Sequence, residues 1–133
     1  VSVSLIWLFV IPVLQWSIPD LKWLFPSKQV AQIIEEHNRG KYPLVAIGYH
    51  EPSLVFYNGS STALVNPEEG VKALLNNPYS YAVVTRGNLE EFLDHLSNKN
   101  VSIEKIEEIK SFNYSKGRTI NLLIFFCSSI TSK

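Results

Sequence analysis

The chain has 133 residues and carries 12 Lys and Arg side chains against 12 Asp and Glu, so its formal net charge at pH 7 is zero. This balance provides no basic field for nucleic acid and no acidic field for a cationic partner. About 100 residues follow the first charged residue, Asp20, which is enough for one domain with one core. The single cysteine, Cys127, has no internal disulfide partner, and its apolar neighbours predict a buried free thiol.

The first 18 residues are uncharged and mostly apolar. A charged side chain at mid-bilayer costs roughly 2.5–3.5 kcal/mol on insertion scales, so such a run predicts the end of a transmembrane helix. The run is short for a complete span, which takes about 20 apolar residues, and Trp7 and Trp16 are placed as interfacial anchors. We therefore expect a membrane-helix end at 1–18, a membrane-proximal linker at 19–26, and a longer protein of which this chain is a piece.

Two other interpretations of this run stay open. A cleaved secretory signal needs a basic n-region and a small-residue cleavage site, and the run has neither. A buried core helix or strand of a soluble protein would also be apolar and uncharged. The truncated membrane helix is the interpretation that we carry forward.

From residue 27 onward, signals for helices and strands alternate along the chain. Caps and prolines mark the helix starts, and short apolar runs bounded by polar residues are typical of strands buried on both faces. Ser27 is expected to cap the first helix and Asn66 and Asn88 two later ones, with Glu69 completing a capping box. The expected helices lie at 27–40, 53–57, 66–77 and 88–96, and the expected strands at 44–49, 62–65, 81–84 and 120–126.

Residues 101–112 are ambiguous, because their isoleucines are spaced by three, which fits neither a clean strand nor a good helix. We expect an extended segment with a bulge there, since 113–117 is typical of a hairpin loop. Together, these expected helices and strands predict a three-layer α/β/α domain over 27–133, with a mostly parallel sheet and a C-terminal β-hairpin.

In open sheets of this kind, ligands bind in the crevice beyond the carboxyl ends of the strands. That edge is expected to carry side chains that follow the first and third strands, together with Asn66, and Arg118 follows the hairpin loop. The candidate docking or ligand-contact residues are Tyr49, His50, Glu51, Arg86 and Arg118.

Each candidate also has a purely structural explanation. Glu51 can simply precede a helix, Asn113 can simply build the hairpin turn, and the two arginines can be solvated surface groups. His50 has no visible partner that would orient it for proton transfer. The chain has no glycine-rich phosphate loop, no G-x-S-x-G and no metal-ligand spacing around its three histidines. We therefore expect no nucleotide site, no catalytic residue, no metal and no cofactor.

Two motifs, at 48–57 and at 112–118, resemble the C-terminal soluble domain of bacterial aminoarabinose-transferase-like glycosyltransferases. These are multi-spanning inner-membrane proteins of the protein-mannosyltransferase superfamily. The passage Leu24-Phe-Pro-Ser27 is similar to the entry from the last membrane helix of that family into its periplasmic domain. The resemblance covers essentially the whole chain and implies transfer of a sugar from a polyprenyl-phosphate carrier to a lipid acceptor such as lipid A.

The family's catalytic carboxylate and carrier-phosphate contacts lie in membrane helices and early periplasmic loops outside this sequence. The resemblance therefore implies an accessory periplasmic domain that packs on its own transmembrane domain, and a chain that is inactive by itself. The alternative is a membrane-tethered module that binds a small ligand or a protein and has no enzyme activity. The gene sequence upstream of Val1 separates the two.

Overall fold

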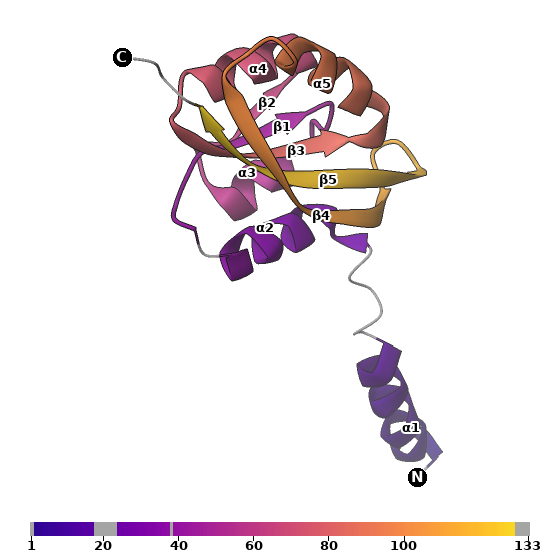
Figure 1. The fold of residues 1–133 in the computed structure, drawn as a ribbon. Coiled ribbons are helices and arrows are strands. Elements are labelled where there is room, and N and C mark those ends of the chain that lie inside the picture. The colour runs from indigo at the N-terminus through magenta and orange to yellow at the C-terminus, as the bar shows by residue number, and fades with distance from the viewer. Residues whose placement is uncertain (1, 18–23, 38, 130–133) are drawn as a thin grey trace.

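The computed structural model describes residues 2–17, 24–37 and 39–129. Within these residues one five-stranded mixed sheet has the strand order β2-β1-β3-β5-β4 (Figure 1). The strands are β1 (Leu44–Ile47), β2 (Ala63–Val65), β3 (Tyr79–Thr85), β4 (Val101–Asn113) and β5 (Arg118–Ser129). The helices are α1 (Ser2–Ser17), α2 (Pro26–His37), α3 (Pro52–Asn58), α4 (Pro67–Leu75) and α5 (Leu89–Leu96), and a 3-10 turn, η2 (Arg86–Asn88), precedes α5.

The expectation of a mostly parallel sheet holds for three of the strands. β1 pairs in parallel with both β2 and β3, whereas β5 runs antiparallel to β3 and to β4. The reason is the short connection 114–117 between β4 and β5, because so few residues can join only antiparallel neighbours. The sheet is therefore mixed rather than mostly parallel.

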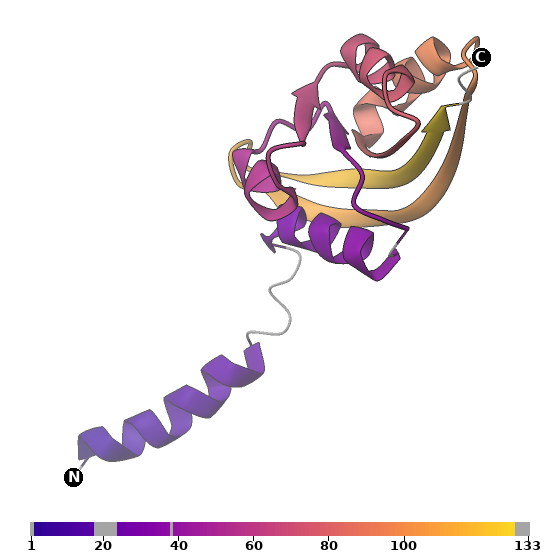
Figure 2. The ribbon, with the colours of Figure 1, turned by 90° about the vertical axis from the view of Figure 1, so that its left-hand side faces the viewer.

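Both faces of β1 are buried, as the uninterrupted apolar run predicted. Successive side chains of a strand point to opposite faces. Val45 and Ile47 belong to a core cluster with residues of α4 and α5, and Ala46 belongs to a second cluster with residues of α2 and α3. Figure 2 shows these two pairs of helices on opposite sides of the sheet.

The bulge expected in β4 is confirmed by a register shift between Lys105 and Glu107 against β5. One extra residue moves all the following side chains to the other face of the sheet. Ile103 accordingly packs against the α4–α5 cluster, while Ile106 and Ile109 pack with the α2–α3 cluster. The three-residue spacing of these isoleucines is therefore the sequence signature of the bulge.

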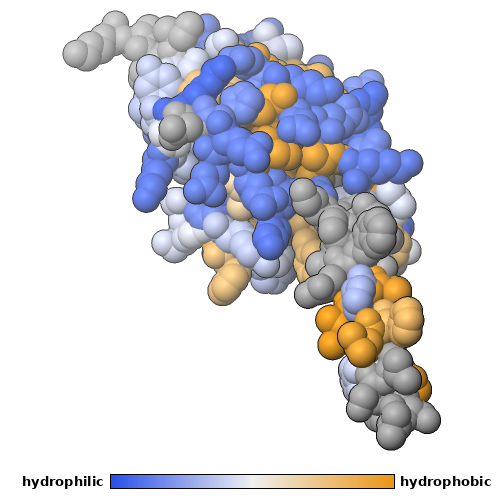
Figure 3. Space-filling model, turned by 90° about the horizontal axis from the view of Figure 1, so that it is seen from below, coloured by the Kyte–Doolittle hydropathy of each residue, from blue (hydrophilic) through white to orange (hydrophobic). Residues whose placement is uncertain are grey.

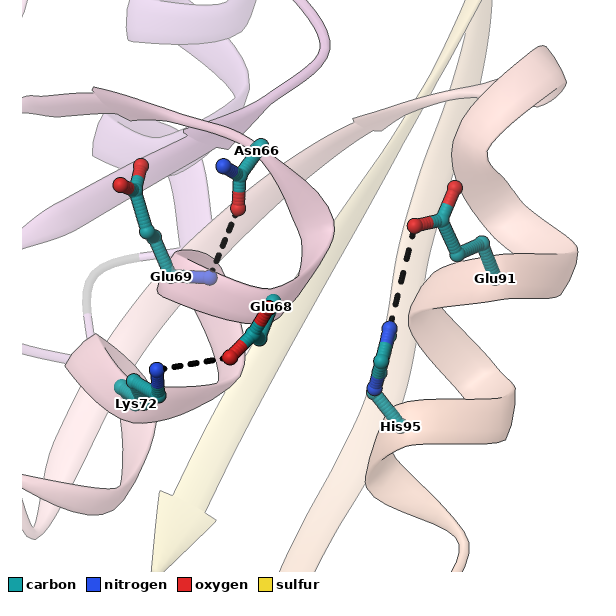
Figure 4. Close-up of polar contacts among 6 residues, drawn as sticks. All are labelled: Asn66, Glu68, Glu69, Lys72, Glu91 and His95. Atoms are coloured by element: carbon teal, nitrogen blue, oxygen red, sulfur yellow. Dashed lines mark hydrogen bonds and ion pairs between the residues drawn. The ribbon is translucent and has the colours of Figure 1, made fainter.

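The cap predicted for α4 is confirmed, because Asn66 Oδ1 accepts a hydrogen bond from the backbone N of Glu69 at 2.9 Å. Figure 4 shows this cap together with two exposed ion pairs, Lys72 with Glu68 on α4 and His95 with Glu91 on α5. In each pair the two residues lie one helical turn apart. Exposed pairs of this kind contribute little to stability, about 0–1 kcal/mol. The packing of α4 and α5 therefore depends on their apolar faces.

Two predicted caps are wrong. Asn88 lies in η2 with φ −103° and ψ 0°, and its side chain makes no cap hydrogen bond, because a 3-10 turn takes the place of the extended residue that an N-cap requires. α2 begins at Pro26, one residue earlier than expected, since proline suits the first helical position. Ser27 is instead a buried residue of the first turn.

The helix α1 lies apart from the sheet and its covering helices in both ribbon views (Figures 1 and 2). Its described side chains, 6–14, are all exposed, and none belongs to either core cluster. Figure 3 shows them as a mainly hydrophobic surface beside the mainly hydrophilic surface of the domain. The expected linker at 19–26 lies largely outside the described residues.

The described helices include none that is both long and apolar enough to span a bilayer. α1 has 16 residues, which correspond to a rise of about 24 Å against a hydrocarbon core of about 30 Å.

We expect the α/β domain to fold without residues 1–18, because α1 contributes no side chain to the described core. Deleting residues 1–18 should leave a monomer whose cooperative thermal unfolding matches that of the whole chain in neutral detergent. Circular dichroism in the near and far ultraviolet, with sedimentation, checks this. Aggregation, or loss of the near-ultraviolet signal, would mean that the leading segment belongs to the core.

A second prediction concerns pH. Burial raises the pKa of the Cys127 thiol from its ordinary value of 9.0 to about 12. The unfolded chain therefore loses this proton first as pH rises, and the folded state becomes less stable. From pH 8 to pH 10 this effect should lower the free energy of unfolding by about 1.4 kcal/mol relative to Cys127→Ala. Urea unfolding of both proteins measures it, and identical pH slopes would contradict burial of the thiol.

Candidate functional site

A pocket of about 480 Å³ lies beyond the carboxyl ends of β1 and β3. We call it the strand-end pocket. Three segments line it: the residues after β1, the turn after β3, and the overhanging end of the β4–β5 pair. The lining residues are Gly48, Tyr49, Thr85–Asn88, Asn113, Lys116 and Arg118–Asn121.

The topology explains why a pocket opens here. The chain leaves β1 through α3 toward β2 at one edge of the sheet, and it leaves β3 through α5 toward β4 at the other edge. Two neighbouring parallel strands whose connections diverge in this way leave a crevice at their carboxyl ends. β5 then extends past β3, because Thr85, the last residue of β3, pairs with Leu122 and leaves 118–121 without a partner in β3. This overhang forms the remaining wall.

Gly48 allows the first two segments to meet. Its φ is +73°, in the left-handed region, and a Cβ there would lie 2.7 Å from Asn88 Cγ and 2.8 Å from Thr85 Oγ1. Asn88 Nδ2 in turn donates a hydrogen bond to Thr85 Oγ1 at 2.6 Å. The turn after β3 is therefore held against the residue after β1, and only glycine fits between them.

Asn113 orders the turn that forms the third segment. Its side chain is only 5% exposed, and its Oδ1 accepts a hydrogen bond from the backbone N of Lys116 at 3.1 Å. Ser115 Oγ lies 2.7 Å from the same Oδ1 and also within hydrogen-bonding reach of Glu51 Oε1. One hydroxyl proton serves one acceptor at a time, so Ser115 can alternate between these two oxygens.

The five sequence-predicted residues are brought only partly together. Tyr49, Arg86 and Arg118 all line the strand-end pocket, so the connection 114–117 between β4 and β5 lies at the same edge as the strand ends. Glu51 lines a neighbouring pocket instead, and His50 is exposed and lines neither. Asn66, also expected at this edge, is occupied as the cap of α4.

Lys116 is the functional candidate that sequence reasoning treated only as part of a turn. It lines the strand-end pocket with Arg118, two residues away on the other side of Gly117. The available signal was the Lys-Gly-Arg order itself, since a two-residue step across a tight turn can place two basic groups in one cavity wall.

The strand-end pocket is positively charged. Its lining contains the basic residues Arg86, Lys116 and Arg118 and no Asp or Glu. Arg86 Nη1 lies 3.4 Å from Glu108 Oε1, in an exposed pair. Among the described residues, neither Lys116 nor Arg118 forms an ion pair. Within the part of the chain that the structure describes, no anion neutralises these two cations.

A second pocket, of about 300 Å³, adjoins the first and shares Tyr49 and Asn113 with it. We call it the entry pocket, because its lining includes Leu24 and Phe25, where the chain enters the domain. Its other walls include the aromatic residues Tyr57, Phe112 and Tyr114 and the charged residues Lys28 and Glu51. Basic and aromatic side chains thus lie side by side at this edge.

Three hydroxyl-bearing residues, of which Ser27 and Tyr49 are buried, line the entry pocket. Ser27 Oγ lies 2.7 Å from Ser53 Oγ and 3.3 Å from Tyr49 Oη. Burial raises the pKa of Tyr49, although its hydrogen bond to Ser27 acts in the opposite direction. The phenol is therefore a neutral hydrogen-bonding group near pH 7. Because the three hydroxyls come from α2, α3 and the loop after β1, they hold these segments together.

These side chains can supply positive charge and hydrogen-bond donors to an anion. In the part of the chain that the structure describes, no three His, Cys, Asp or Glu side chains gather where a metal ion could bind. The comparisons with known proteins returned no matching family model, curated protein or solved structure. The strand-end pocket is therefore assigned from its geometry and charge alone.

We expect Asn113→Ala to loosen the wall that carries Lys116 and Arg118. The variant leaves the Lys116 N–H without its acceptor and should cost about 1–2 kcal/mol of stability. Amide hydrogen exchange at Lys116 should accelerate. Asn113→Asp, which keeps an acceptor oxygen, and the exposed Asn100→Ala serve as controls. An exchange rate at Lys116 that is unchanged in Asn113→Ala would show that the turn is held by other contacts.

Proposed function

We propose that this chain is the C-terminal soluble domain of an integral-membrane glycosyltransferase. On this proposal the whole enzyme moves a sugar from a polyprenyl-phosphate carrier to a lipid acceptor such as lipid A. The domain is accessory and non-catalytic, has a three-layer α/β/α form with a C-terminal hairpin, and lies on the periplasmic side of a bacterial inner membrane. Residues 1–18 are then the end of a membrane helix.

One observation carries this proposal: the basic strand-end pocket adjoins the place where the chain from α1 enters the domain. The entry segment supplies Phe25, whose side chain is 54% exposed, and the hairpin turn supplies Tyr114, which is 58% exposed. Aromatic side chains are enriched at membrane interfaces, and basic side chains are attracted to anionic headgroups. This edge therefore suits a surface that faces a bilayer or a membrane-embedded domain.

Glu51, Arg86 and Arg118 are the charged groups that we propose to dock on the transmembrane part or its headgroup layer. All three are partly or fully exposed in this chain. Because water solvates their charges, these residues have little effect on the free energy of unfolding of the domain. On docking they become desolvated, and each requires a partner of opposite charge. Removing one side of such a buried pair typically costs about 3–5 kcal/mol.

We therefore expect Arg118→Ala in the full-length enzyme to weaken docking and lower sugar transfer without unfolding the domain. Glu51→Ala should act in the same direction, and Lys99→Ala, an exposed charge between α5 and β4, should have no effect. Transfer is measured with a polyprenyl-phosphate sugar and a lipid acceptor. Thermal unfolding of the 133-residue chain is measured alongside, and that chain should show no turnover by itself.

The contrary outcome is equally clear. If Arg118→Ala and Glu51→Ala both unfold the 133-residue chain, and transfer falls only in proportion to the amount of protein, the two residues belong to the scaffold. Transfer by the 133-residue chain above a heat-inactivated control would contradict the non-catalytic assignment. In that case His50 and Glu51 would be the groups to test as a base.

A second candidate function is favoured by the position of the strand-end pocket. A cavity of about 480 Å³ at the divergence of two parallel strands is where α/β domains hold small ligands. A membrane-tethered binding module without enzyme activity would use the same pocket. The reading frame upstream of Val1 distinguishes the two, since further apolar spans support the transferase and a nearby start codon supports the module.

A further inference from the structure

We infer that the strand-end pocket binds the phosphate group of a phosphorylated ligand through Arg86, Lys116 and Arg118. This inference goes beyond the proposed function, because it assigns a ligand chemistry to a defined site. It applies equally to an enzyme's accessory domain and to a tethered binding module.

The charge of the pocket is the first argument. Two segments supply the cations, Arg86 from the turn after β3 and the pair Lys116 and Arg118 from the end of the β4–β5 pair. The lining contains no carboxylate, and within the described residues the hairpin pair has no ion-pair partner. An anion with more than one charge, and with oxygens on several sides, matches cations that approach from two walls. Phosphate esters have both properties, whereas a carboxylate carries a single charge.

The second argument is that both walls are ordered before any ligand arrives. Asn113 fixes the backbone at Lys116, and Arg118 is the first residue of β5, paired with Asn113 across the ladder. On the opposite wall, Thr85 Oγ1 accepts a hydrogen bond from Asn88, so the Thr85 hydroxyl proton remains to be donated to a ligand oxygen. The backbone that carries the exposed cationic side chains is therefore ordered in advance, so binding has to order only the side chains and loses less conformational entropy.

The third argument is the space between the walls. Gly48 lines the pocket and has no side chain that would fill it. A Cβ placed on Gly87, which also lines the pocket, would meet no atom within 4 Å. The pocket is therefore open toward the turn after β3. Its volume of about 480 Å³ suits a phosphate group with part of the molecule that bears it.

Two sources can present this group: a free phosphorylated metabolite, or the headgroup of a lipid whose apolar part would lie toward the aromatic entry pocket. The chemistry at the cations is the same for both. The two sources are separated by offering each one alone.

The experiment uses the 133-residue chain, labelled with 15N, in neutral maltoside micelles at constant ionic strength. Inorganic phosphate is titrated in one arm, and phosphatidic acid is incorporated into the micelles in the other, with phosphatidylcholine as the lipid control. We expect saturable amide shifts at Gly87, Asn88 and Lys116 in at least one arm. Lys116→Gln/Arg118→Gln should weaken that binding about tenfold or more, because two charge-assisted contacts are lost.

The matched control is Lys41→Gln/Lys99→Gln, which removes the same charge from exposed positions outside the strand-end pocket and should leave the affinity unchanged. Arg86→Gln tests the opposite wall and keeps the inference testable if the first double variant does not fold. Saturation with phosphate alone indicates a soluble ligand, and saturation with phosphatidic acid alone indicates a lipid headgroup.

Amide shifts that do not saturate in either arm overturn the phosphate site. So does an equal loss of affinity in Lys116→Gln/Arg118→Gln and in the control Lys41→Gln/Lys99→Gln. Because binding is measured on this chain and transfer on the full-length enzyme, the phosphate site can fail while the proposed function stands, and the reverse also holds.

Discussion

β1 and β3 are buried on both faces, and this burial decides where the domain can hold polar chemistry. Ala46 and Val83, from the two neighbouring strands, are completely buried in the cluster beneath α2 and α3, and Ile47 is completely buried in the cluster beneath α4 and α5. A polar group within either layer would need a hydrogen-bond partner that these side chains do not offer. Polar groups therefore gather where the strands end, and the diverging connections of β1 and β3 leave room for them there.

Local signals predicted the parts of the fold that local physics determines. The apolar run of β1, the Asn66 cap and the bulge in β4 could be predicted because each depends on residues close together in sequence. Ser27 and Asn88 carried the same kind of cap signal, but the structure uses them differently. Ser27 contacts Tyr49 and Ser53, and Asn88 packs beside Gly48. Asn88 also donates to the nearby Thr85, but Gly48 and the two partners of Ser27 lie more than 20 residues away, and no local pattern indicates such contacts.

The strand-end pocket, like the fold, could be predicted only in part. The carboxyl ends of β1 and β3 were expected to form it, because that rule depends only on the order of the elements. The contribution of Lys116 depends on the overhang of β5 past β3, which is set by the pairing of Thr85 with Leu122. Register between strands far apart in sequence is fixed by the packing of both faces. Sequence reasoning therefore found the edge of the sheet and Arg118 in the overhanging wall, but it missed Lys116 as a pocket residue.

The hydroxyl cluster of Ser27, Tyr49 and Ser53 links the strand-end pocket to the point of chain entry. Ser27 is in the first turn of α2, and its Oγ contacts Tyr49, which lines both pockets, and Ser53 at the start of α3. The direction in which the strand-end pocket opens is thus fixed relative to the start of α2 by packing within the domain. Any surface that holds the segment preceding α2 would therefore also orient the pocket. For this reason the basic wall and the aromatic entry pocket are best understood as one surface.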